Sequence, residues 1–180
     1  MRFVGVGRIA RPRSVILMGL LGLLSLAFAG SVSAGPGRTV RIMGDEKFVP
    51  NVMIMATLRF TPGPITVDSG DTVTWSSQTD EPHTITIVDA SDVPTTIDEV
   101  FGCTAPGGAC SPALAGHFTD PPTIVLGGGS DGTAGLDGVG DSLLVFPNGS
   151  ISAPVTASPG TTLHYLCAIH PWMIGSINVR

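Results

Sequence analysis

The sequence of 180 residues predicts an all-β fold, an antiparallel sandwich of short strands with one long Gly- and Pro-rich insertion. Short segments in which apolar and polar residues alternate recur along the chain, and turns rich in Gly and Pro separate them. After the N-terminal region, no segment shows sustained helical periodicity. The composition, 43% hydrophobic and 13% charged, excludes a disordered chain and a coiled coil.

The expected strands begin after the N-terminal region. In the segment 71–76, Val73 and Trp75 alternate with threonines, as in a half-buried strand. The other expected strands span residues 38–43, 51–60, 65–67, 82–87, 142–146, 151–156, 161–167 and 173–179. Several short strands at close spacing are typical of a sandwich or barrel.

Residues 89–141 differ from the rest of the chain. They contain the segment from Cys103 to Cys110, then Pro121-Pro122, then a run from 127 to 140 in which seven of fourteen residues are Gly. Glycine at this density packs no core, because it has no side chain to bury and is costly to order. We expect an inserted loop region of the same domain, held by a local disulfide and mobile toward its end.

The first 34 residues have the layout of a secretory signal peptide. Four arginines lie within residues 1–13, an apolar run follows from 15 to 29, and Val32-Ser33-Ala34 fits a cleavage site. The apolar run is short for a membrane-spanning helix. We therefore expect a single mature domain, 35–180, exported to the periplasm or the extracellular space. An uncleaved N-terminal anchor is the alternative, and membrane contact is expected only in that case.

Charge and cysteine content narrow the function further. Without the four N-terminal arginines, five basic residues remain against fourteen acidic ones, a formal charge of −9. A nucleic-acid binder needs clustered Lys and Arg, so this class is excluded. In an oxidising compartment Cys103 and Cys110 are expected to form a disulfide, which leaves Cys167 as an unpaired thiol.

The donors of a metal site stand near the C-terminus. Cys167, His170 and Met173 bring thiolate, imidazole and thioether together at intervals of three residues, directly after an expected strand. Soft sulfur donors beside imidazole suit copper, whereas magnesium and calcium prefer oxygen and zinc rarely takes thioether. A blue-copper site of two His, one Cys and a weak axial Met requires a second His.

Strand parity predicts that His. His83 shares its face with Ile85 and Ile87, and Cys167 lies on the inward face of its own strand. His164 falls on the opposite face and His117 lies in the insertion, so we expect both at the surface. The methionines near the first strands (Met43, Met53 and Met55) are expected in the core.

At this point the sequence resembles the plastocyanin/amicyanin-type cupredoxins, which are type 1 blue copper proteins. The resemblance rests on Ser-Gly-Asp-Thr-Val-Thr-Trp75, on Glu-Pro-His83-Thr and on Tyr-Leu-Cys167-Ala-Ile-His170-Pro-Trp-Met173, and it covers roughly residues 38–88 and 142–180. It implies a Greek-key β-sandwich that holds one copper ion, with His83, Cys167 and His170 as strong ligands and Met173 as the weak axial ligand. It also implies one-electron transfer between redox partner proteins, which the sequence does not identify.

Two departures from the family pattern bear on the site. Thr84 stands where family members commonly have an Asn that braces the ligand loop. The insertion also separates His83 from Cys167 by 84 residues. Pro171 and Trp172, which flank His170, are expected to form the docking patch through which an electron leaves.

Other functions remain open on sequence grounds. A copper carrier or storage protein that delivers metal without redox cycling is the main alternative, and a metal-free interaction module is the third. A buried Cys167/His170 nucleophile pair would be poorly arranged for catalysis, so we expect no enzymatic activity.

Overall fold

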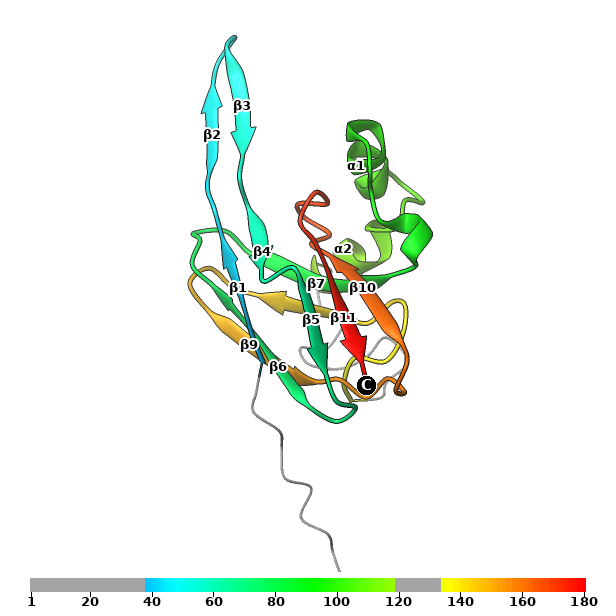
Figure 1. Cartoon of the computed structure of the whole chain (residues 1–180). Coiled ribbons are helices and arrows are strands. Elements are labelled where there is room, and N and C mark those ends of the chain that lie inside the picture. Colours follow the sequence, from blue (N-terminus) through cyan, green and yellow to red (C-terminus); the bar gives the residue numbers. More distant parts are fainter. Residues whose placement is uncertain (1–37, 119–133) are drawn as a thin grey trace, which may run out of the picture. The chain divides into compact units, whose positions relative to one another are not determined.

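The computed structural model describes residues 38–118 and 134–180, which form a sandwich of two β-sheets (Figure 1). The first sheet has the order β4 (Arg59–Thr61), β1 (Arg38–Met43), β6 (Thr72–Ser77), β9 (Ser150–Pro154). The second has the order β5 (Pro64–Val67), β11 (Ile174–Val179), β10 (Thr162–Leu166), β7 (His83–Val88), β8 (Ser142–Val145).

The predicted all-β sandwich is confirmed, but its sheets are mixed. β1 pairs with β6 and β11 pairs with β5 in parallel, while the other pairs within the two sheets are antiparallel. The chain crosses between the sheets after β4, β5, β6, β8 and β9, as Greek-key sandwiches do. The expected signal segment 1–34 lies outside the described residues. Among the residues that are described, no helix is long and apolar enough to cross a membrane.

The main core lies between the two sheets. In β6 the side chains alternate between buried and half-buried, as the sequence predicts, and Trp75 is completely buried. The ring of Tyr165 meets those of Phe60 and Trp75 edge to face, with ring centroids 5.0 and 6.0 Å apart. Each fully buried large apolar side chain stabilises the fold by about 1.5–3 kcal/mol.

Gly175 tests how tightly this core is packed. A Cβ at this position would overlap the ring and hydroxyl of Tyr165. We expect Gly175→Ala to lower the free energy of unfolding by about 1–3 kcal/mol, because a fully buried ring has no room to move. Gly102→Ala is the matched control, since its Cβ would meet no atom within 4 Å. Denaturant unfolding measures both variants, and equal stability of the two would contradict the packing described here.

The insertion contains two helices that the sequence analysis missed. They are α1 (Ile97–Thr104) and α2 (Ser111–Phe118), preceded by a 3-10 turn, η1 (Ala90–Asp92). Thr96 and Glu99 form a capping box at the start of α1. The predicted disulfide between Cys103 and Cys110 is present and links α1 to the residue before α2. The first half of the run 127–140, residues 127–133, lies outside the described residues.

The insertion packs on the outer face of the second sheet. A second apolar cluster combines Cys103, Cys110 and Ala113 of the insertion with Val88, Leu166 and Ala168. As a result, every residue of β7 is buried, on both faces of the strand. The insertion therefore covers this sheet near the end of β10.

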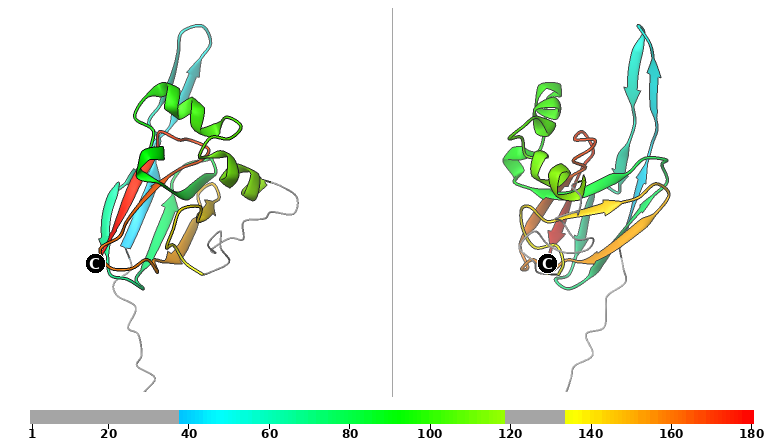
Figure 2. Two further views of the ribbon diagram at one scale, coloured as in Figure 1. Left: turned by 90° about the vertical axis from the view of Figure 1, so that its right-hand side faces the viewer. Right: turned by 180° about the vertical axis from the view of Figure 1, so that it is seen from behind.

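A third pair of strands, β2 (Glu46–Val49) and β3 (Met53–Ala56), forms a hairpin that extends beyond the sandwich (Figures 1 and 2). The sequence predicted one strand over 51–60 and a core position for its methionines. This is wrong for Met53 and Met55, which are 42% and 45% exposed, because the hairpin has no sheet to pack against.

Candidate metal centre

The sheet topology brings the two halves of the site together. β7 begins at His83, and the antiparallel β10 ends at Leu166, directly before Cys167. Leu166 lies opposite Thr86 in this pair, so the residues that follow β10 reach the start of β7. An insertion placed between β7 and β8 therefore leaves the relation between His83 and Cys167 intact.

Backbone hydrogen bonds close the loop from Cys167 to Met173. The N–H of Cys167 donates to the carbonyl of Met173 over 3.0 Å. Within the loop, the N–H of His170 donates to the carbonyl of Cys167 over 3.1 Å, and the N–H of Met173 donates to that of His170 over 2.9 Å. Three bonds within seven residues fix the positions at which the side chains leave the loop.

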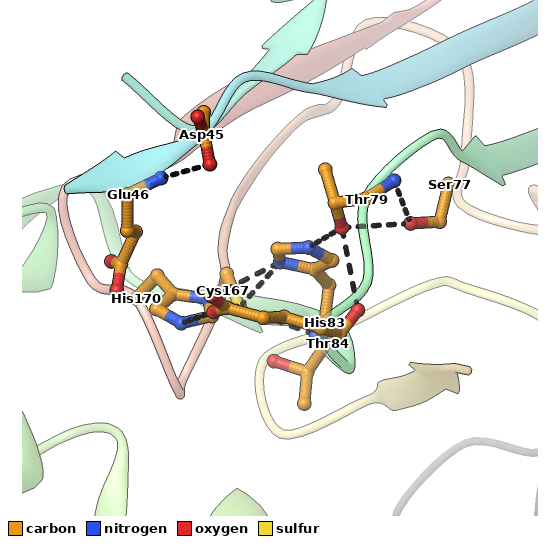
Figure 3. A network of polar contacts seen from close by, with 9 residues as sticks. Asp45, Glu46, Ser77, Thr79, His83, Thr84, Cys167 and His170 are labelled. Atoms are coloured by element: carbon orange, nitrogen blue, oxygen red, sulfur yellow. Dashed lines mark hydrogen bonds and ion pairs between the residues drawn. The ribbon is translucent and has the colours of Figure 1, made fainter. Parts of the chain in front are cut away.

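The side chains of His83, Cys167 and His170 converge on one point (Figure 3). The Cys167 Sγ lies 3.8 Å from His83 Nδ1 and 3.7 Å from His170 Nδ1, and the two Nδ1 atoms are 3.2 Å apart. Two nitrogens about 2.0 Å from one ion at trigonal angles would be about 3.5 Å apart. The spacing of these donors therefore fits a single metal ion.

The outer hydrogen bond of His83 leaves Nδ1 free to bind a metal. Its Nε2 lies 2.7 Å from the Thr79 hydroxyl, which donates its own proton to the carbonyl of Glu81. A metal on Nδ1 requires the ring proton on Nε2, and the Thr79 hydroxyl is placed to accept that proton. Burial lowers the pKa of His83 to about 4, and repulsion from His170 when that ring is protonated acts in the same direction, which favours the neutral ring that a metal requires.

His170 is held in the same way by a carboxylate. Its Nε2 lies 3.0 Å from Glu81 Oε2, and a carboxylate only accepts, so Nε2–H donates and Nδ1 again faces inward. Burial lowers the pKa of His170, while the Glu81 and Glu46 carboxylates act in the opposite direction. Two imidazole lone pairs and a sulfur thus face one another, an arrangement that a soft cation satisfies.

Thr84 takes over the bracing role that the sequence left uncertain. Its backbone N–H donates to Cys167 Sγ over 3.3 Å, and its hydroxyl accepts the N–H of Ala168 over 2.7 Å. Burial raises the pKa of the Cys167 thiol. The N–H groups of Thr84, His170 and Ile169 favour the thiolate instead. Coordination by a metal would deprotonate the thiol outright.

The other predicted site residues fall in different places. Met173 is buried at the end of the loop, and its role as axial ligand stays a prediction. Trp172 is 37% exposed with its ring centroid 5.3 Å from that of His170, whereas Pro171 is buried and offers no surface to a partner. His164 is half-buried on the face of β10 away from the core.

The expectation that His117 lies at the surface is wrong. It is 5% exposed, and its Nε2 lies 2.7 Å from the Ser142 hydroxyl. Sequence reasoning also gave no role to Thr79 and Glu81, the hydrogen-bond partners of the two site histidines. Thr79 and Glu81 lie within four residues of His83 in the sequence, and this closeness could have indicated that they contact the site.

No protein-family model and no curated protein sequence matches the chain. The solved structures to which it is similar include a purple cupredoxin from Nitrosopumilus maritimus, at 15% identity over 79% of this chain and 99% of that one, with a TM-score of 0.41. They also include amicyanin from Paracoccus versutus, at 13% identity over 81% of this chain and 83% of that one, with a TM-score of 0.39. At 13–15% identity these similarities concern the fold alone.

Proposed function

We propose that this chain is an exported cupredoxin-type protein that binds one type 1 copper ion and carries single electrons between redox partners. One observation supports this most directly. The Nδ1 atoms of His83 and His170 and the Sγ of Cys167 face one another within 3.8 Å, and the outer nitrogen of each ring is already hydrogen-bonded. Such a donor set suits copper that moves between two oxidation states.

The scaffold would keep the site unchanged when an electron arrives or leaves. Copper supplies the redox chemistry, and the protein's part is to hold the ligands. His83 is fixed by Thr79, His170 by Glu81, and the Cys167 sulfur by the N–H of Thr84. Cys167 and His83 are 0% exposed, which excludes water. Little rearrangement is then needed during transfer.

The electron would pass through His170, the most exposed of the three donor side chains at 7%. Trp172 lies against its ring and reaches the surface. At the same end of the sandwich, the hairpin carries exposed Phe48 and Ile54 on the same face as Glu46. Glu46 itself lies within reach of Glu81 and His170. A redox partner with an apolar contact area and basic residues around it fits this surface.

The disulfide supports export. Bonds such as Cys103–Cys110 persist in oxidising compartments and are rare in the cytoplasm, which agrees with the signal-like sequence of residues 1–34. Periplasmic or extracellular location is thus part of the proposal.

Titration of the purified protein with copper(II) tests the proposal. We expect one equivalent to produce an intense visible thiolate-to-copper band, and voltammetry to give a reversible one-electron wave. A colourless protein would refute the site, and a coloured protein without a reversible wave would refute the carrier role.

A second candidate, delivery of copper to another protein, is favoured by the exposure of Met53 and Met55, which lie on one face of the hairpin. Thioethers at the surface could pass on a copper(I) ion. Fast loss of copper to a competing chelator, slowed by exchanging both methionines for leucine, would support delivery. The Met43→Leu variant, changed at a half-buried position, is the control.

A further inference from the structure

A chain of buried hydrogen bonds connects the metal-binding loop with the insertion. The N–H of Ala168 donates to the Thr84 hydroxyl over 2.7 Å, and this oxygen lies 2.9 Å from that of Thr86. The Thr86 hydroxyl is 2.8 Å from Ser142 Oγ, which is 2.7 Å from His117 Nε2. All five residues are at most 5% exposed, so water does not replace any of these bonds.

The three hydroxyl protons can point in one of two directions. In the outward direction Thr84 donates to Thr86, Thr86 to Ser142, and Ser142 to a bare Nε2 of His117. In the inward direction each bond reverses, and the Thr84 proton is left to donate to Cys167 Sγ, beside which Thr84 lies through its own N–H at 3.3 Å. The direction therefore decides whether the sulfur receives an O–H donor.

The acceptors available favour the outward direction. Outward, each hydroxyl accepts one hydrogen bond and donates one, and the last proton goes to an imidazole nitrogen. Inward, Thr84 Oγ1 would accept from both Ala168 and Thr86, and the last proton would go to sulfur, a weaker acceptor. Burial lowers the pKa of His117 and thus keeps its ring neutral, so that one nitrogen remains bare.

We propose that His117 is a positioning residue for the copper site, which draws the hydroxyl protons of Ser142, Thr86 and Thr84 outward and so withholds one hydrogen bond from Cys167. This inference rests on the proposed copper function. Hydrogen bonding around the cysteine sulfur tunes the reduction potential of blue-copper sites, and donors stabilise the electron-rich reduced state less when they point away. His117 thus holds the potential lower than it would otherwise be.

The test is a set of substitutions that each remove one link. In His117→Phe the buried Ser142 proton loses its outward acceptor, and only the inward direction then gives every hydroxyl proton a partner. Ser142→Ala and Thr86→Val free the Thr84 proton in the same way. We expect the reduction potential to rise in all three variants. In the double variant of His117→Phe with Thr86→Val, we expect no rise beyond that of Thr86→Val alone.

This pattern separates positioning from a loss of packing. If His117→Phe acted through a packing defect at α2, its shift in reduction potential would add to that of Thr86→Val. If it acts through the hydroxyl chain, Thr86→Val has already broken the chain and no further shift is expected. Two controls repeat the same chemistry elsewhere: Thr74→Val breaks the Thr74–Ser152 hydroxyl pair in the other sheet, and His164→Phe exchanges a histidine on β10. Unchanged potentials in the three test variants, additive shifts, or equal shifts in the controls would overturn the proposal.

A measurement on the copper-free protein tests the same arrangement without the metal. Nitrogen-15 NMR should show His117 with a proton on Nδ1 and a bare, hydrogen-bonded Nε2. A proton on Nε2 would overturn the outward direction. A colourless copper titration would instead refute the copper site, so the two failures are distinguishable.

Discussion

Replacing Cys167 with serine is expected to abolish the intense visible band and to weaken copper binding by more than about a hundredfold. The thiolate is the source of the band, and a neutral hydroxyl in a buried site is a poor ligand for a soft ion. Even the loss of an outer hydrogen-bond partner can weaken a metal site by about 10–100-fold, so the loss of a donor in direct contact should exceed that. Optical titration and competition with a chelator measure the two effects.

The fold should survive this substitution. Serine is smaller than cysteine by less than a methyl group, and its oxygen can still accept the N–H of Thr84. The matched control replaces the other two cysteines, Cys103 and Cys110, which are joined in a disulfide. This double substitution should leave the visible band in place. A metal-free interaction module predicts no difference between wild type and Cys167→Ser, and that result would contradict the copper site.

The residues of the site were predictable because they lie on regular strands or in a short loop. His83 was identified by strand parity, since a strand with period two places it with Ile85 on the inward face. Cys167 and His170 followed from their spacing and donor types. The structure brings these three side chains together, and hydrogen bonds in the loop fix them.

The insertion could not be predicted in the same way, because its helices are stabilised by tertiary contacts. Each of α1 and α2 has only eight residues, too few for a helix to be stable alone in water. The local signal was the segment Thr96-Ile97-Asp98-Glu99, whose first and last residues form a capping box. The burial of His117 depends on the packing of α2 near Ser142 of β8, which no local pattern encodes.

The prediction that Met53 and Met55 lie in the core was wrong because of what surrounds the hairpin. Alternation predicts burial only where another layer covers one face, and β2–β3 pairs only with itself. Met53 and Met55 therefore alternate as core residues do, yet they face solvent.

The copper-free protein is expected to lose stability as the pH falls from about 6.5 to 4. Burial lowers the pKa of His83 from 6.5 to about 4, and it also lowers the pKa values of His117 and His170. Unfolded histidines take up protons first as the pH falls, so the stabilisation from a neutral His83 is complete above 6.5 and is lost on the way to its folded pKa. For His83 alone the loss amounts to about 3 kcal/mol.

Denaturant unfolding at a series of pH values measures this loss. Glu99, whose ordinary pKa of 4.5 is lowered by hydrogen bonds from Thr95 and Thr96, acts in the same direction but below pH 4.5, so the interval above pH 5 isolates the histidines. His83→Gln should reduce the slope of the free energy of unfolding against pH in this interval, because glutamine takes up no proton in the folded or the unfolded state. Copper-loaded protein should resist acid further, since protons must displace the ion from both rings before the fold is destabilised. An equal slope in wild type and His83→Gln would show that burial does not hold His83 neutral. The lone pair on its Nδ1 would then need another explanation.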